Sequence, residues 1–548
     1  MKMLKAALFL FLLVLVSGCN FLDYDESTEL TKEDVFSNFE RSKSYLTNIY
    51  SHLPSGFNSI DGAMRSSASD DAEEVWELSN VQKFNDGSWS AIQTLDDSWG
   101  EMYSGIRAVN QFLVEIDSQT FPERQYNDDY EQLMEQLELY PYEARFLRAY
   151  FYYELLKRYG SVPLVTSVLT AEEANNVEQA PFGEVLRFIL EETDAVSLAL
   201  PVSYSSIMNN ETGRATRGAA LALKAKALLY AASPLNNPNG DIQKWQEAAI
   251  ASKALIDSSW YALENNYNNV VNNYTGTELI FGRRLGNSNS FERSNFPIGF
   301  EGARPGTSPT QNLVNSYEMQ SNGLAIDEQG SGYDPENPYE GRDPRLSSTV
   351  MYNGSTWKGT NLEIYNGGLH GPPQARATKT GYYLKKYVRQ DINLDPTNTT
   401  TKEHTWVLFR YGEVLLNYAE AMNEVYGPED DGGMGMTARQ AVNMVRARSD
   451  MPEFPSGLSK MEFREKLRNE RRVELAFEDH RFWDIRRWKI GDQTTDIYGV
   501  NITKESDDEF TYEQKLVEQR VFEEKMYRYP LPQSELFNNP NLQQNSGW

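Results

Sequence analysis

Cysteine and histidine are scarce in this 548-residue chain, which has one cysteine and four histidines. The lone cysteine, Cys19, excludes an intrachain disulfide and a thiolate metal cluster. His52, His370, His404 and His480 never fall at a metal-ligand spacing such as i, i+4. We therefore expect no zinc chemistry and, if Cys19 is modified, no cysteine nucleophile.

Positive charge is also in short supply. Lys and Arg total 52 against 79 Asp and Glu, which gives a formal net charge of −27. Nucleic acid and anionic lipid headgroups carry charge of the same sign and are poor electrostatic partners for such a chain. Hydrophobic residues still make up 40% of the sequence, as in globular proteins. We expect a folded protein that binds no nucleic acid.

Two familiar catalytic motifs are missing. The sequence has no G-x-S-x-G nucleophile elbow and no glycine-rich phosphate loop with its lysine. Adjacent carboxylates do occur at Asp70-Asp71, Glu73-Glu74 and Asp96-Asp97. Glycoside hydrolysis needs two carboxylates roughly 5 to 10 Å apart, and adjacency in sequence does not establish that distance. A surface glycoside hydrolase stays open as an alternative to solvated or helix-capping carboxylates.

No cofactor is expected, and calcium is the one structural ion that the sequence suggests. Asp430-Asp431-Gly432-Gly433 offers carboxylates and carbonyls of the kind that hold calcium, but not at the spacing of an EF-hand. A plain loop is the alternative interpretation.

The N-terminus has the layout of a secretory signal. An apolar run from Ala6 to Val16 follows two lysines and is too short to span a bilayer. It leads into Ser17-Gly18-Cys19, and small residues before a lone cysteine are what a lipoprotein peptidase requires. The sequence predicts a signal peptide over residues 1–18, lipidation of Cys19 and a protein anchored to a membrane without spanning it. An ordinary signal peptide that contains a cysteine is the alternative.

Helical hydrophobic periodicity recurs along most of the chain after the leader. The predicted helical ranges are 32–50, 99–113, 141–159, 182–200, 217–232, 245–255, 406–426, 438–448 and 461–488. Pairs such as the alanine-rich range 217–232 and its neighbour 245–255 suggest a tetratricopeptide-like stack, although no clean repeat period is present. The sequence therefore predicts a mainly α fold.

The chain from Pro141 to Leu164 carries the strongest of these helical patterns. Leu147, Phe151 and Leu155 recur at helical spacing, and tyrosines widen the apolar stripe until it nearly encircles the helix. Such a helix must be covered on most sides, and Gly160 marks its end. We expect it to be an inner helix of the stack.

The pattern changes between about 279 and 400, where Gly, Asn and Ser are frequent. Leu279-Ile280-Phe281 is typical of a short strand. The sequence predicts a loop-and-strand insertion on a helical scaffold at about 30–275 and 405–548. Because binding residues concentrate on loops held by a rigid scaffold, we expect the insertion to carry part of the ligand site.

Asn469 to Trp488 interleaves arginines with carboxylates. Opposite charges three to four residues apart pair along a helix instead of presenting a bare positive face. We expect structural ion pairs here, with a ligand site as the alternative.

Taken together, several segments resemble the SusD/RagB family of surface lipoproteins, which capture nutrients in Bacteroidetes-type bacteria. The matching segments are Glu143 to Pro163, RGAALALKAKALLYAASP from Arg217, PTQNLVNSYEM from Pro309, GRDPRL from Gly341, TGYYLKKYV from Thr380, FRYGEVLLNYAEAMNE from Phe409, NERRVELAFEDHRFWDIRRW from Asn469 and the closing NPNLQQNSGW. The acidic stretch after Cys19 resembles the surface-export signal of these bacteria.

The resemblance implies one SusD-like domain over residues 19–548 with a tetratricopeptide-like scaffold. It also implies a lipid anchor on the outer membrane facing the cell exterior, glycan or other nutrient binding without catalysis, and partnership with a SusC-like TonB-dependent barrel transporter.

Aromatic rings outside the helical register are the candidate ligand-binding residues. The C–H face of a sugar ring packs against a flat indole or phenol while its hydroxyls bond to nearby polar groups. The candidates are Trp76, Trp89, Phe296, Trp357 and Tyr365, with Asn85, Asp86 and Arg304 as hydroxyl partners. For each aromatic, packing inside a loop core is the alternative. The leading hypothesis is glycan capture without catalysis; the others are a glycoside hydrolase and a structural lid that takes a non-glycan nutrient such as a peptide.

The lipoprotein prediction is tested by metabolic labelling. We expect radiolabelled palmitate to mark the protein in its native host, and Cys19→Ser to lose the label because the cysteine sulfur is the attachment atom. Recovery of the unsubstituted protein, unlabelled, with soluble periplasmic contents contradicts the prediction.

Overall fold

The computed structural model describes residues 30–205, 207, 210–506 and 509–548. Cys19 and the leader lie outside the described residues. Helices account for 41% of the structure and strands for 12%, which confirms the mainly α fold class. Within the described ranges, no helix combines the length and the hydrophobicity needed to cross a membrane.

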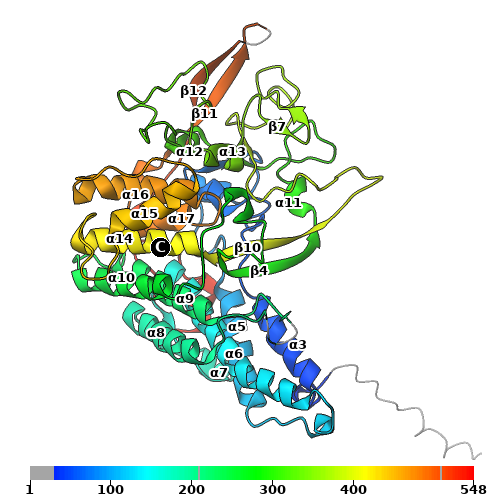
Figure 1. The fold of residues 1–548 in the computed structure, drawn as a ribbon. Helices are drawn as coiled ribbons and strands as arrows, with labels where there is room; N and C mark the ends of the chain where they lie inside the picture. Colours follow the sequence, from blue (N-terminus) through cyan, green and yellow to red (C-terminus); the bar gives the residue numbers. More distant parts are fainter. Residues whose placement is uncertain (1–29, 206, 208–209, 507–508) are drawn as a thin grey trace, which may run out of the picture.

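The body of the protein is a stack of helices in which α5 packs on α6, α6 on α8, α8 on α9, α9 on α10 and α10 on α14 (Figure 1). The helices of this body are α3 (Phe39–Tyr50), α5 (Trp99–Ile116), α6 (Tyr130–Tyr159), α8 (Phe182–Ala199), α9 (Arg217–Ala232), α10 (Ile242–Asp257), α14 (Tyr411–Tyr426), α15 (Ala438–Arg448), α16 (Lys460–Glu474) and α17 (Arg481–Trp488). Shorter helices are α2 (Lys32–Phe36), α4 (Gln82–Asn85), α7 (Ala171–Ala174), α11 (Ser290–Arg293), α12 (Gln311–Ser316), α13 (Arg345–Thr349) and α18 (Gln533–Asn538).

Helix α6 is the inner helix that its sequence predicts. Leu147, Phe151 and Leu155 are fully buried, as is most of the helix from Glu143 onward. Gly105 of α5 permits the close contact between α5 and α6, since a Cβ there would lie 2.7 Å from a ring carbon of Phe151. The helix ends at Gly160, whose φ of 80° suits glycine.

The strands form small antiparallel two-stranded sheets. They are β1 (Ala72–Glu74) with β5 (Thr307–Pro309), β2 (Val162–Pro163) with β3 (Gln179–Ala180), β4 (Leu279–Ser288) with β10 (Lys402–Arg410), β6 (Val350–Met351) with β9 (Tyr383–Leu384), β7 (Thr356–Trp357) with β8 (Thr360–Asn361), and β11 (Asp496–Lys504) with β12 (Phe510–Gln519). The β4–β10 pair flanks the insertion and leads directly into α14.

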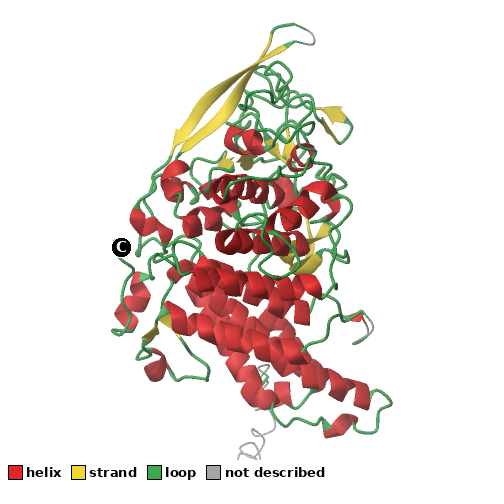
Figure 2. Cartoon of the chain, turned by 60° about the vertical axis from the view of Figure 1, so that its left-hand side comes forward, coloured by secondary structure: helices red, strands yellow, loops and turns green. Residues whose placement is uncertain are grey.

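Two sequence predictions are corrected by these strands. Trp406 to Arg410 was expected to open a helix but belongs to β10, because β4 supplies backbone partners and aromatic and β-branched residues suit a buried strand. The β11–β12 hairpin lies in a range expected to be helical scaffold. Figure 2 shows it projecting from one end of the helical body.

The predicted helix over 461–488 is also broken. α16 ends at Glu474 and α17 begins at Arg481, and between them Phe477 and Asp479 adopt φ values of 61° and 66°. Left-handed backbone interrupts a right-handed helix, so the chain turns here.

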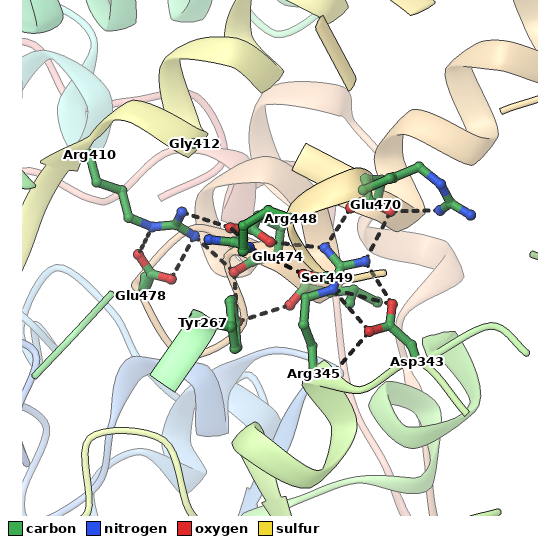
Figure 3. A network of polar contacts seen from close by, with 12 residues as sticks. Tyr267, Asp343, Arg345, Arg410, Gly412, Arg448, Ser449, Glu470, Glu474 and Glu478 are labelled. Atoms are coloured by element: carbon green, nitrogen blue, oxygen red, sulfur yellow. Dashed lines mark hydrogen bonds and ion pairs between the residues drawn. The ribbon is translucent and has the colours of Figure 1, made fainter. Parts of the chain in front are cut away.

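Buried charges join the insertion to the helical body (Figure 3). Glu470, Glu474 and the following Glu478 are all buried. Their contacts are Glu470 with Arg345 and Arg446 (2.8 Å), Glu474 with Arg345 (2.9 Å), Arg410 (2.7 Å) and Arg448, and Glu478 with Arg410 and Lys386 (2.6 Å each). Arg345 and Lys386 come from the insertion, and the other partners come from β10 and α15.

Structural ion pairing in Asn469 to Trp488 is therefore observed, but its geometry differs from the prediction. Asp484 and Arg487 pair within α17 at 2.7 Å, as expected. The carboxylates Glu470, Glu474 and Glu478 instead meet arginines and a lysine from distant segments. These pairs are tertiary contacts, which spacing along one helix does not reveal.

We expect Glu474→Gln to lower the free energy of unfolding by about 3–5 kcal/mol, because three guanidinium groups lose a buried carboxylate. Glu191→Gln is the control, since Glu191 and Arg187 form an exposed pair at 4.0 Å; its cost should stay below about 1 kcal/mol. Urea unfolding measures both. Equal stability of the two variants contradicts the structural role of the network.

Candidate functional site

Trp76 is held at the surface by two contacts with one neighbouring segment. The Val75 N–H donates to the Gly306 carbonyl at 3.0 Å, which continues the pairing of β1 with β5. The Trp76 Nε1–H donates to the Pro305 carbonyl at 3.1 Å. The side chain remains 38% exposed. Backbone and indole are thus both fixed, while part of the ring meets solvent.

One charged side chain lies over this ring, and others lie on the segments next to it. The Arg376 guanidinium lies 4.6 Å from the centre of the indole, and the Lys379 Nζ lies 3.7 Å from an oxygen of the exposed Glu77. Arg304 is exposed and directly precedes Pro305, whose carbonyl binds the indole. We call this region the Trp76 surface; it comprises Trp76, Glu77, Leu78, Arg304, Arg376 and Lys379. It combines an aromatic ring with flexible hydrogen-bond donors, the groups that a sugar ring and its hydroxyls require.

A neutral carboxyl lies beneath the Trp76 surface. Glu74 is 1% exposed, and its two oxygens accept hydrogen bonds from the Trp76 backbone N–H (3.4 Å) and the Thr307 hydroxyl (3.5 Å). Burial raises its pKa to about 8, and the neighbouring Glu73 adds to the effect. Glu74 therefore retains its proton at neutral pH and adds no buried charge under the indole.

Four of the residues predicted from the sequence as ligand contacts are buried. Trp89 is 2% exposed and packs between Phe84, Tyr529 and Trp548, with ring centroids 4.7, 5.2 and 4.4 Å away. This packing corrects its assignment as a stacking platform, because neither ring face is open to a ligand.

Phe296 and Trp357 are likewise 2% exposed each and pack edge to face at 5.7 Å. Asn85 is buried, and its amide donates to the Ser67 carbonyl (3.2 Å) and the Gln82 side chain (2.9 Å). The Phe296 and Trp357 rings pack against the protein itself, which corrects their assignment as stacking platforms, and the Asn85 amide is already paired within the protein. Packing inside a loop core was the alternative for these aromatics.

The remaining predicted residues are accessible. Tyr365 is half-buried against Phe510, with centroids 5.4 Å apart, and Asp86 is exposed and accepts a hydrogen bond from the Ser88 N–H at 2.8 Å. The structure places Arg304 next in sequence to Pro305, whose carbonyl accepts the Trp76 indole N–H. Sequence reasoning missed Arg376, which reaches the indole from a distant loop.

Four of the carboxylates that suggested hydrolysis are paired with arginines. Their contacts are Asp70 with Arg481 (2.8 Å), Asp71 with Arg472 (2.7 Å), Glu73 with Arg520 (2.5 Å) and Asp96 with Arg65 (2.7 Å) and Arg158 (3.2 Å). Burial opposes ionisation of Asp96, but Arg65 and Arg158 lower its pKa to about 2. These paired carboxylates link distant segments of the fold, and burial raises the pKa of the neighbouring Glu74 to about 8.

The calcium prediction is not tested by the structure. Asp430 and Asp431 accept hydrogen bonds from the Gly432 and Gly433 N–H groups at 2.9 Å each, the geometry of a tight turn. In the part of the chain that the structure describes, no group of three His, Cys, Asp or Glu side chains is arranged to hold a metal ion.

Comparison with known proteins decides the family. Residues 277–548 match the model of the SusD family, and residues 20–229 match a family described as "Starch-binding associating with outer membrane". The chain belongs to the SusD/RagB family. It is thus a member of a carbohydrate-binding family associated with the outer membrane.

Relatives and solved structures agree with this assignment. Two SusD-like proteins of Formosa agariphila are 25% and 27% identical over 414 and 429 residues, which cover 72% and 74% of this chain and 71% and 73% of theirs. A SusD-like protein of Bacteroides fragilis superposes with a TM-score of 0.78 at 28% identity over 94% of this chain and 98% of its own. A SusD-like carbohydrate-binding protein of the same strain gives 0.77 at 27% identity over 93% and 100%.

The raised pKa of Glu74 predicts a pH dependence of stability. Unfolded Glu74 releases its proton near its ordinary value of 4.5, whereas folded Glu74 keeps it to about 8. Its contribution to stability is therefore complete below pH 4.5 and is lost as the pH rises through 8. Thermal unfolding of Glu74→Gln should show a shallower decline than the unsubstituted protein across this window. Parallel profiles would contradict a protonated Glu74.

Proposed function

We propose that the protein is a non-catalytic lipoprotein of the cell surface that binds oligosaccharides or polysaccharides and delivers them to a partner TonB-dependent transporter in the outer membrane. Membership of a carbohydrate-binding family supports the class of ligand. The observation that carries the proposal is the Trp76 surface, where a partly exposed indole is fixed by its own N–H and the Arg376 guanidinium lies over one face of the ring.

The expected binding mode follows from these contacts. A sugar ring packs its C–H face on the indole, and its hydroxyls bond to Arg376, Arg304 and Lys379. A fixed aromatic loses little conformational entropy on binding. One ring gives weak affinity, so affinity should grow with oligosaccharide length as further rings meet the surface.

Absence of catalysis is part of the proposal. Asp70, Asp71, Glu73 and Asp96 are each bound by arginine, and a carboxylate so paired is poorly placed to act as an acid or a nucleophile. A reducing-sugar assay with the same oligosaccharides tests this point; accumulation of product would favour a hydrolase.

Delivery to a transporter rests on the family resemblance and on the predicted lipid at Cys19. It is tested by affinity purification of the tagged protein from its native outer membrane. Recovery without any large barrel protein would contradict the partnership.

We expect Trp76→Ala to weaken binding of the best oligosaccharide ligand by about fivefold to thirtyfold, because one stacked ring contributes on the order of 1–2 kcal/mol. Trp76→Phe, which keeps a smaller ring, should recover part of the affinity. Tyr126→Ala is the control, since Tyr126 is 91% exposed and lies outside the Trp76 surface. Isothermal titration calorimetry with a panel of oligosaccharides measures each variant.

Two outcomes contradict the proposal. If no glycan in the panel releases or absorbs heat, the protein does not capture carbohydrate. If a glycan binds equally well to Trp76→Ala, capture occurs elsewhere on the molecule. Heat from a peptide instead would favour the structural-lid alternative with a non-glycan nutrient.

A further inference from the structure

The protein also has a cavity that shares no lining residue with the Trp76 surface. It has a volume of about 480 Å³ and lies where η4 (Tyr267–Asn269), α13 and the segment 385–391 meet. The volume falls within the range of about 300–1,000 Å³ that is usual for small-molecule sites. Hydroxyl and amide side chains line much of it: Asn268, Asn272, Ser348, Thr356 and Gln390.

One residue that lines the cavity carries a buried hydrogen-bond donor that has no partner among the described residues. Trp357 lines the cavity and is 2% exposed, and among the described residues its indole N–H has no hydrogen-bond partner. Buried polar groups in folded proteins are almost always paired, so an unpaired one calls for a ligand or a water. An acceptor oxygen that comes within hydrogen-bond distance of this N–H would satisfy it.

The same cavity also carries a positive charge that is not neutralised. Lys385 is half-buried and donates to the Ser347 carbonyl at 2.5 Å, and among the described residues it forms no ion pair with a carboxylate. Burial alone lowers its pKa. The other lining cations are paired, Lys386 with Glu478 at 2.6 Å and Arg389 with Asp391 at 3.2 Å.

This surplus stands out because the chain as a whole carries a formal charge of −27. Among the described residues that line the cavity, Asp391 is the one carboxylate, and it already pairs with Arg389 and Lys402. An anion would therefore find an ammonium and an indole N–H both without an acidic partner.

We propose that this cavity binds an anionic sugar of one or two rings, whose carboxylate or sulfate accepts hydrogen bonds from Lys385 and Trp357. The hydroxyl and amide lining meets the sugar hydroxyls. Trp357 acts through its N–H and not through a ring face, which is buried. The choice of a sugar rests on the proposed carbohydrate-binding function, but binding in this cavity does not require the Trp76 surface.

The test is titration of the purified protein with galacturonate, galactose 6-sulfate and galactose, followed by calorimetry. We expect at least one acidic sugar to bind roughly tenfold or more tightly than galactose, since a hydrogen bond to a charged group is worth that ratio. The first two probes separate carboxylate from sulfate recognition. Affinity for the acidic sugar should fall as salt concentration rises.

Variants locate the site. Lys385→Gln and Trp357→Phe should each lower the affinity for the acidic sugar roughly tenfold. Trp357→Phe keeps an aromatic ring for packing. Lys224→Gln is the matched control, because Lys224 is on α9 and pairs with Asp194 at the surface; it should bind as the unsubstituted protein does. Circular dichroism confirms that each variant is folded.

The outcome separates this inference from the proposed function. Trp76→Ala should lose neutral oligosaccharide yet keep the acidic sugar. The inference is overturned if neither acidic sugar binds more tightly than galactose, or if Lys385→Gln binds the acidic sugar unchanged. Neither result bears on neutral glycan capture at the Trp76 surface, which is tested separately by the oligosaccharide titration of Trp76→Ala.

Discussion

Burial of three carboxylates in and just after α16 is the constraint on which the rest of the structure depends. Glu470, Glu474 and Glu478 are removed from water, and a buried charge is tolerated only when it is paired and hydrogen-bonded. α16 alone does not supply those pairs. The chain therefore brings arginines to it from the insertion, from β10 and from α15 (Figure 3). The insertion also supplies Lys386. The loop-rich insertion is thereby fixed to the helical body by charge as well as by hydrophobic packing.

The same principle extends to the Trp76 surface. Asp70 and Asp71 pair with Arg481 of α17 and Arg472 of α16, and β1 follows directly. β1 pairs with β5, and the backbone then places Trp76 against the Pro305 carbonyl. A continuous chain of contacts thus runs from the buried network to the indole. An irregular loop so anchored holds its aromatic ring with little freedom, which is what weak, additive sugar stacking requires.

How much of this was predictable depends on the range of the interaction. Local signals served well: the alanine-rich α9 and the arginine-bearing α15 begin and end where the periodicity places them, and Gly160 ends α6. Contacts between segments far apart in the chain cannot be predicted from the sequence pattern. Trp89 has an exposed, loop-like sequence context, yet Trp548 at the other end of the chain buries it. Trp406 becomes part of a strand only because β4 lies beside it. For the same reason sequence placed Trp76 and Arg304 among the candidates but gave no sign of Arg376, whose position depends on how two distant loops meet.

In the proposed binding mode, a helical frame held together by buried ion pairs presents the Trp76 indole to a sugar ring. The decisive measurement is a crystal structure of the protein with its best-bound oligosaccharide. We expect a sugar ring packed on the Trp76 indole with hydroxyls within hydrogen-bond distance of Arg376 or Arg304. An oligosaccharide seated elsewhere, with the Trp76 surface empty, would contradict it.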